Sequence, residues 1–271
     1  MQHIELSDQN VVPLTHVADN IKGLRILFVN VFGITSPDGS WTLVDAGLPH
    51  STDRIRHWAK ARFTNPPNAI LLTHGHFDHV GAVKELAELW SVGVYAHPLE
   101  APFLTGKQQY PAPDPTVGGG IMSVMSPLYP RGPIDITHHF EILPEDGAVP
   151  FMPEWKIIHT PGHTVGHISL FRESDRTLFV GDAFCTADQQ SFLKIAVQKP
   201  ELNGPPAYFT PDWDAARDSV RKLAALKPLT LAPGHGLPMS GADIPAKLDQ
   251  LAKGFDRIAR PKHQRQKDPA A

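Results

Sequence analysis

The sequence has little of what secreted, membrane-spanning or nucleic-acid-binding proteins need. Its single cysteine, Cys185, excludes an internal disulfide and suits a reducing compartment. No apolar run reaches the length of a membrane span, and the first residues lack the features of a signal peptide. The formal net charge is -3, and no long basic run precedes the C-terminal end. We therefore expect a cytoplasmic protein, monomeric or homodimeric, that acts on a small molecule and binds neither nucleic acid nor membrane.

Histidine, in contrast, is abundant. The chain has 15 histidines among 271 residues, which directs attention to metal or proton chemistry. Hydrophobic residues make up 41% and charged residues 20%, the usage of an ordinary globular protein with a sizeable core.

Short apolar runs alternate with helical patterns along both halves of the chain. Such alternation predicts an α/β fold, an αββα sandwich of two facing mixed sheets with helices on the outer faces. Ser51 and Asp212 are the expected N-caps of two of the helices. The expected strands are 25–32, 41–45, 69–72, 92–97, 155–159, 167–172, 177–181 and 229–232, and the expected helices are 51–62, 80–90, 213–223 and 241–259.

We expect one domain over residues 1–260, with an insertion at about 108–140. The insertion is rich in glycine and proline but too apolar for a linker, so it is expected to form a lid, a pocket wall or a dimer contact. The basic segment 261–271 is expected to be a disordered tail.

The segment THGHFDHVGA at residues 73–82 places four candidate metal ligands where an apolar strand ends and a helix begins. Alternation in an extended chain sends His74 and His76 to one side, while Asp78 and His79 at the turn can face a neighbouring position. Imidazole and carboxylate groups suit zinc, and also iron or manganese. Solvated surface histidines are the alternative, but the spacing favours two adjacent metals.

Three further motifs share this context. HTPGHTVGH contains His163, FVGDAF contains Asp182, and APGHG contains His235, each close behind a predicted strand. A single glycine-flanked histidine or aspartate is usually a turn residue. Four such motifs at strand ends, where loops converge, indicate one common site.

In this order, HGHFDH, TPGHTVGH, GD and GHG resemble the motifs of the metallo-β-lactamase superfamily over residues 25–240. The resemblance implies the αββα sandwich and a binuclear metal site at one edge of its sheets. The ligands that it implies are His74, His76 and His163 for the first metal, Asp78, His79 and His235 for the second, and Asp182 as a bridge between both.

The same resemblance implies supporting residues. Asp45, in VDAGLP, matches an aspartate that holds a ligand imidazole in place, a turn aspartate being the alternative. His167 is expected to be a hydrogen-bonded neighbour of the site and not a further ligand. Cys185, three residues after Asp182, is expected to be a small buried side chain and not a reactive thiol.

The expected cofactors are two divalent ions, with zinc favoured and iron or manganese as alternatives. Two such ions that share a water lower its pKa, so the expected nucleophile is a bridging hydroxide. Asp78, which orients it, and Asp182 are the expected catalytic carboxylates.

Differences from the sequence patterns of known subfamilies limit the substrate classes that we expect. Asp182 stands where metallo-β-lactamases proper usually carry Cys or Ser, and the following AFCTADQQSF lacks the Gly-rich, Arg-containing stretch of glyoxalase II-like thioesterases. Acyl-homoserine lactonases carry a tyrosine where this chain has Cys185, and Tyr208 is a candidate to replace it in space. We predict a carboxylic-ester or lactone hydrolase. The alternatives are phosphodiester, organophosphate or thioester hydrolysis, and a non-catalytic metal-binding module.

An apolar substrate pocket is expected under the insertion. Core packing is the alternative role for its aromatic candidates. The expected wall residues are Phe184, Phe192, Tyr208, Met122 and Met125.

Overall fold

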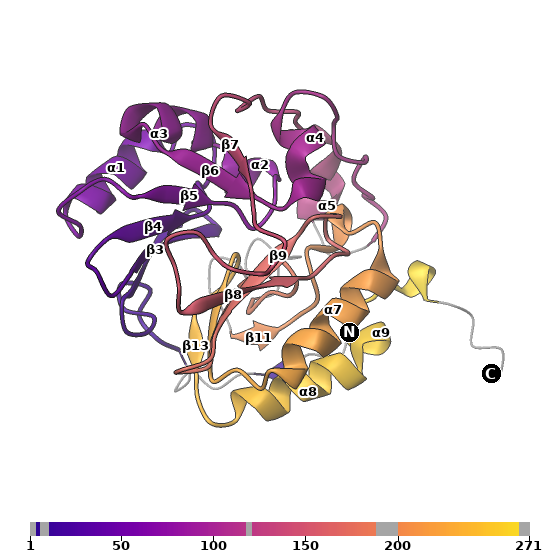
Figure 1. Ribbon diagram of the computed structural model, residues 1–271. Helices are drawn as coiled ribbons and strands as arrows, with labels where there is room; N and C mark the ends of the chain where they lie inside the picture. The colour runs from indigo at the N-terminus through magenta and orange to yellow at the C-terminus, as the bar shows by residue number, and fades with distance from the viewer. Residues whose placement is uncertain (1–3, 6–10, 118–120, 188–199, 266–271) are drawn as a thin grey trace.

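The computed structural model describes residues 4–5, 11–117, 121–187 and 200–265. Within them, two β-sheets pack face to face and helices cover both outer faces, as Figure 1 shows. The predicted αββα sandwich is confirmed.

The first sheet has six strands in the order β2-β3-β4-β5-β6-β7, among the described residues. Its N-terminal half is antiparallel, and β4, β5, β6 and β7 run parallel. The strands are β2 (Ile21–Ile26), β3 (Val29–Thr35), β4 (Trp41–Val44), β5 (Ala69–Leu71), β6 (Gly93–Ala96) and β7 (Phe140–Ile142).

The second sheet has the order β13-β12-β10-β9-β8, and a short antiparallel pair, β1 with β11, lies apart from both sheets in the described chain. Strands β10 and β12 are parallel, and β8 runs in their direction because β9 is antiparallel to both β8 and β10. The strands are β8 (Trp155–His159), β9 (Ile168–Arg172), β10 (Thr177–Gly181), β12 (Thr230–Pro233), β13 (Met239–Ser240), β1 (Ile4–Glu5) and β11 (Glu201–Leu202).

The helices predicted at 51–62, 80–90, 213–223 and 241–259 are present, and the described residues form further short helices that were not predicted. The α-helices are α1 (Thr52–Lys60), α2 (Phe77–Val80), α3 (Val83–Trp90), α4 (Ala101–Leu104), α5 (Ile121–Met125), α7 (Trp213–Ala225), α8 (Ile244–Lys253) and α9 (Phe255–Ile258). Single 3-10 turns are η2 (Pro98–Glu100), η3 (Ser126–Leu128), η4 (Ala207–Phe209) and η5 (Lys262–Gln264).

Alternation along the strands explains why both faces of each sheet are buried. In β4, Leu43 packs under α1 and α3, whereas Val44 faces the other sheet. In β10, Leu178 packs under α7 and α8, whereas Phe179 faces the first sheet. Three apolar layers result, one between the sheets and one beneath each set of helices.

One predicted strand is divided. Residues 25–32 form the end of β2 and the start of β3, because Leu27 turns the chain with a φ of 57° and lies 71% exposed. Apolar residues on both sides of the turn hide it in the sequence. The predicted hairpin is nevertheless present, since β3 pairs antiparallel with β4.

The helix ends differ in detail from the prediction. Ser51 lies at the N-cap of α1 but its side chain makes no capping hydrogen bond. Asp212 does cap α7, accepting from the backbone N–H of Ala215 at 2.9 Å. The last predicted helix is interrupted at Gly254, which separates α8 from α9.

The C-terminal segment corrects another expectation. The sequence predicts a disordered tail from residue 261, yet Pro261 is buried and Lys262–Gln264 form η5. Ordered structure therefore extends through Arg265, and residues 266–271 lie outside the described residues. No helix in the described chain is long and apolar enough to cross a membrane.

Candidate metal centre

The candidate ligands lie behind the C-terminal ends of four strands, as predicted. His74 and His76 follow β5, and His163 follows β8. Asp182 comes directly after β10, and His235 comes shortly after β12. Because β8, β10 and β12 point in one direction, their ends meet at one edge, where β5 of the facing sheet also ends.

The structure brings all seven candidate ligands together in a buried cluster. They form three groups in which the ligand atoms lie within 4.8 Å of one another: His74, His76 and His163; His74, His79 and Asp182; and Asp78, His79 and His235. His76 Nδ1 and His163 Nε2 face each other at 2.9 Å.

Asp182 lies between the two sets of histidines. Its Oδ2 is 3.2 Å from His235 Nε2 and 3.4 Å from His163 Nε2, and its Oδ1 is 3.5 Å from His79 Nε2. Asp78 Oδ2 lies 3.4 Å from His235 Nε2. One carboxylate thus reaches both sets, the arrangement that a bridging ligand requires.

Hydrogen bonds on the outer side of four imidazoles direct their second nitrogens toward the cluster. A ring nitrogen that is held in this way fixes both the tautomer and the ring orientation. The outer contacts are His74 Nδ1 with Thr73 Oγ1 (3.1 Å), His79 Nδ1 with Asp45 Oδ2 (2.8 Å), His163 Nδ1 with Thr210 Oγ1 (3.1 Å) and His235 Nδ1 with the Phe28 carbonyl (2.9 Å).

Asp45 makes the contact that the resemblance implies. One oxygen accepts from His79 Nδ1, and the other accepts from the Thr73 backbone N–H at 2.8 Å. The Thr73 hydroxyl also bonds to this carboxylate. Asp45 therefore ties His79 to the start of the first histidine motif.

His167 lies beside the cluster with both nitrogens engaged. Its Nε2 accepts from the Asp182 backbone N–H at 2.8 Å, so the ring proton sits on Nδ1, which contacts Thr160 Oγ1 at 2.8 Å. Burial lowers the pKa of His167 to about 3, in agreement with a neutral ring. His167 has no nitrogen left for a metal and instead positions Asp182.

Buried charge dominates the centre. Burial alone would raise the pKa of Asp182, but His235 and His79 outweigh it and hold that pKa well below its usual range. Burial opposes the charging of His235, yet Asp182 and Asp78 raise its pKa to about 10. Burial lowers the pKa of His76 to about 4.

The donor set fits divalent cations. His74 Nε2, His79 Nε2 and Asp182 Oδ1 are buried without a hydrogen-bond partner among the described residues. Buried polar atoms without partners are costly, and a cation at this point would satisfy all three. Imidazole nitrogens and carboxylate oxygens are ligands for zinc, iron and manganese alike.

Sequence reasoning missed Glu100, which joins two of the ligand loops. Its buried carboxylate accepts from the backbone N–H groups of Gly75 (3.0 Å) and Gly166 (2.8 Å), from Thr164 Oγ1 (2.7 Å) and from the Tyr110 hydroxyl. Burial raises the pKa of Glu100, although the hydrogen bonds oppose this. The sequence signal that could have identified it is its place shortly after β6, the neighbour of β5 in the sheet.

A cavity of about 200 Å³ opens beside His76 and His163. Of the predicted wall residues, Tyr208 lines it. Phe192 lies outside the described residues.

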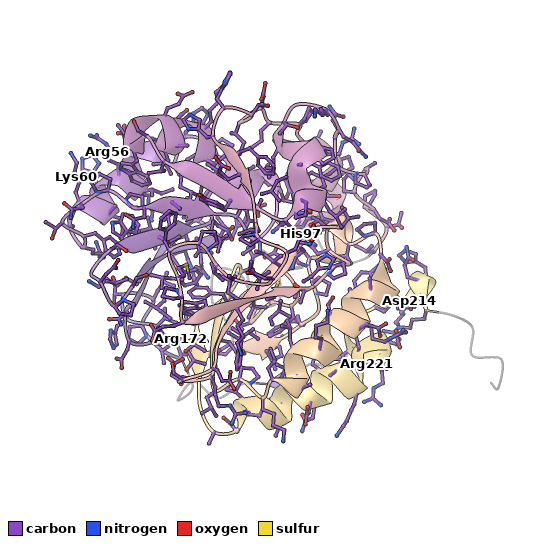
Figure 2. All side chains as sticks on the ribbon, in the orientation of Figure 1. Arg56, Lys60, His97, Arg172, Asp214 and Arg221 are labelled. Carbon is purple, nitrogen blue, oxygen red and sulfur yellow. The ribbon has the colours of Figure 1, made fainter. Side chains whose placement is uncertain are left out.

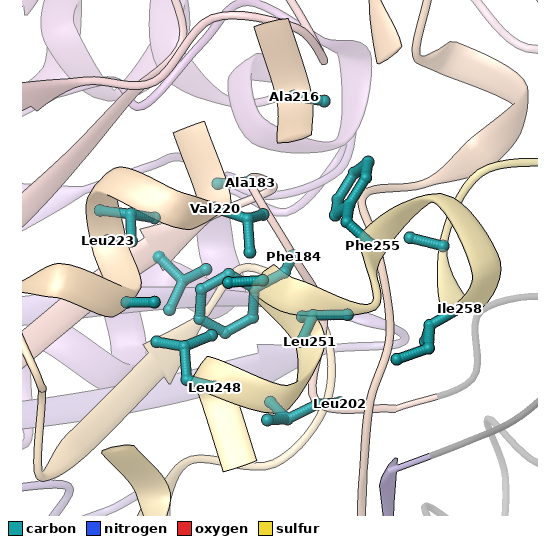
Figure 3. Close-up of a cluster of buried hydrophobic side chains, with 14 of the residues drawn as sticks. Ala183, Phe184, Leu202, Ala216, Val220, Leu223, Leu248, Leu251, Phe255 and Ile258 are labelled. Atoms are coloured by element: carbon teal, nitrogen blue, oxygen red, sulfur yellow. The ribbon is translucent and has the colours of Figure 1, made fainter. Parts of the chain in front are cut away.

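The other predicted wall residues lie elsewhere. Phe184 is 0% exposed and packs against α7 and α8, as Figure 3 shows. Met122 is also buried in that core, and Met125 is 41% exposed and does not line the cavity. Phe184 and Met122 are therefore core residues and not pocket walls. An aromatic ring or a thioether suits an apolar core as well as a pocket, so the sequence does not distinguish the two roles. Cys185 is buried, as predicted.

Comparisons with known proteins agree with this geometry. The family model of the metallo-beta-lactamase superfamily matches residues 24–235. The chain is 47% identical over 259 residues to the probable metallo-hydrolase YflN of Bacillus subtilis, covering 91% of this chain and 98% of that protein. It is 28% identical to the probable metallo-hydrolase YybB of the same organism, covering 72% of this chain and 74% of that protein.

Solved structures share the fold. The BLEG-1 B3 metallo-beta-lactamase has a TM-score of 0.58 at 25% identity, with 84% of this chain and 96% of that chain covered. The protein TTHA1623, in a di-iron-bound form, has a TM-score of 0.56 at 25% identity, with 86% and 96% covered. By its sequence, its two facing sheets and its histidine and aspartate motifs, this chain belongs to the metallo-beta-lactamase superfamily.

Proposed function

We propose that this protein hydrolyses a carboxylic ester or lactone of a small molecule at a binuclear metal centre. The observation that carries the proposal is the buried cluster of seven ligand side chains beside a mainly apolar cavity. The curated relatives described as probable metallo-hydrolases support the reaction class.

Divalent ions at the cluster would polarise the scissile carbonyl and supply a hydroxide nucleophile at neutral pH. The chain's own residues provide the positions. Asp182, 3.2 Å from His235 Nε2, would bridge the two ions, and Asp78, 3.4 Å from the same nitrogen, would orient the attacking water. We propose zinc as the metal, and iron is the alternative that the di-iron form of TTHA1623 supports.

The cavity favours a small, uncharged acyl group. An apolar cavity of roughly 150 Å³ holds a benzene molecule, so a space of about 200 Å³ suits a short chain or a single ring. Among the described residues that line it, none is Lys or Arg. A phosphodiester anion would find no protein cation there, which favours an ester or lactone.

Tyr208 is the proposed hydrogen-bond donor to the departing oxygen. It lines the cavity together with His76, and Asp78, Asp182 and Cys185 are among the groups that act on its hydroxyl electrostatically. Burial, followed by Asp78, Tyr129 and Asp182, raises the pKa of Tyr208 well above its usual value, so the hydroxyl keeps its proton. Its place in the cavity wall, together with its electrostatic interaction with Cys185, supports the proposal that it replaces the tyrosine that lactonases carry at the position of Cys185.

The test combines metal analysis with a substrate panel. Purified protein is assayed on p-nitrophenyl esters, lactones, thioesters and phosphodiesters, with and without a chelator. We expect ester or lactone turnover that the chelator removes and added zinc, iron or manganese restores. Turnover only of phosphodiesters or only of thioesters, or ester turnover that survives complete demetallation, would contradict the proposal.

A further inference from the structure

The cavity beside the metal centre has a wall that comes from the far C-terminal end of the chain. Gln264, in η5, lines the same space as His76 and His163. The remaining lining residues come from three other stretches, namely residues 103–114, 164–165 and 208–211. The segment 261–265, which the sequence predicts to be disordered, therefore completes the cavity.

Arginine side chains fix the base of this segment. Arg265 donates to the backbone carbonyls of Arg257 (2.7 Å) and Arg260 (3.1 Å), at the end of α9. Arg260 in turn pairs with Asp214 on α7 and with Asp256 on α9. Figure 2 shows Asp214 at the end of α7 where the C-terminal chain passes. The segment is thus tied to the helical layer that covers the second sheet.

A side-chain pair ties this segment to residues 103–114, which also line the cavity. His263 Nε2 lies 3.1 Å from Asp114 Oδ2. Asp114 also donates its backbone N–H to the Tyr208 carbonyl at 2.9 Å, and its Oδ1 accepts from Thr116. The His263–Asp114 pair therefore connects η5 to Asp114, whose backbone is hydrogen-bonded to Tyr208.

This contact is easily broken. The side chains of His263 and Asp114 are 43% and 36% exposed, and exposed ion pairs contribute little to stability. The base of the segment can remain folded through Arg265 and Arg260 when the His263 contact opens. Opening would let the wall that Gln264 contributes move outward and so enlarge the cavity.

We propose that residues 261–265 form the outer wall of the substrate cavity, and that the His263–Asp114 contact limits the length of acyl chain the cavity admits. The inference rests on the proposed function. His263 is a positioning residue in it, since it acts on the substrate through the wall and not on the reacting atoms.

The test uses full-length, metal-loaded protein and a series of p-nitrophenyl esters from acetate to octanoate. His263→Ala should raise the octanoate-to-acetate ratio of kcat/KM by about tenfold, the scale at which hydrophobic pockets discriminate chain length. kcat on acetate and the metal content should stay unchanged. His263→Gln keeps an N–H donor for Asp114 and should restore the wild-type ratio. Lys262→Ala, an exposed neighbour, is the matched control and should leave the ratio unchanged.

An unchanged ratio in His263→Ala, or an equal loss of rate on every ester, would overturn the inference. If the wild-type protein hydrolyses no ester, the proposed function fails. Hydrogen exchange then tests separately whether the His263–Asp114 contact holds residues 261–265 against the cavity. The amides of Gln264 and Asp114, which donate to Pro261 and Tyr208, should lose protection together in His263→Ala. Loss of protection at only one of these amides, or at neither, would overturn the inference that residues 261–265 form this wall.

Discussion

Replacement of Glu100 by Gln should loosen the junction between two metal-ligand loops. The carboxylate accepts four hydrogen bonds, two of them from backbone N–H groups that have fixed directions, those of Gly75 and Gly166. In the variant the amide NH₂ replaces one oxygen. The hydroxyls of Tyr110 and Thr164 can rotate to accept from it, but a backbone N–H cannot. The Gly166 N–H loses its acceptor if the NH₂ takes the place of Oε1, whereas the Gly75 N–H keeps the Tyr110 hydroxyl oxygen at 3.0 Å if the NH₂ takes the place of Oε2.

The magnitude follows from these contacts. In either orientation one backbone N–H loses its bond to a charged acceptor, which is worth about 1.5–3 kcal/mol, so we expect a fall of about that size. Urea denaturation of metal-free protein should show this fall in the free energy of unfolding with an unchanged m-value.

The matched control is Glu154→Gln, an exposed glutamate for which about 0.5 kcal/mol or less is expected. Metal affinity should also fall in Glu100→Gln, because Gly75 stands between two of the ligands. A stability change in Glu100→Gln as small as in the control would refute the reasoning.

Three further changes test the centre itself. Asp182→Asn should remove turnover and lower the bound metal while the circular dichroism spectrum stays that of the wild type; full activity would contradict its bridging place. Gly234→Ala should weaken metal binding roughly 10- to 100-fold in dialysis, since a Cβ there would collide with Asp182 Oδ1 and His79 Cε1, and wild-type affinity would contradict this. Tyr208→Phe should lower kcat roughly 10²-fold or more on esters with poor leaving groups and much less on p-nitrophenyl esters. An equal effect on both would point to packing instead.

The sequence predicted the layers and the positions of the metal-ligand candidates because both depend on local patterns. Alternation in strands such as β4 and β10 specifies which side chains face each layer. The ligand motifs lie at strand ends, and parallel strands bring such ends to one edge. The spacing of His74 and His76 therefore marks them as candidates, and Asp182 becomes one through its conjunction with the other motifs and the family resemblance.

The missed features depend on contacts between distant segments. Glu100 acts through backbone N–H groups and hydroxyls from three other segments, which no residue spacing records. The turn at Leu27 lies within a continuous apolar run, and η5 lies in a polar, basic sequence whose order comes from Arg265 and Asp114. Phe184 is apolar and close in sequence to Asp182, but proximity in sequence does not distinguish a pocket wall from a core residue.

We propose that the seven buried side chains of the cluster hold a pair of divalent ions. The most direct test counts the ions bound per chain, by plasma mass spectrometry after equilibrium dialysis against zinc, iron or manganese. We expect two ions per wild-type chain and a clear loss in His76→Ala. Wild-type protein that binds none of these metals would contradict this proposal.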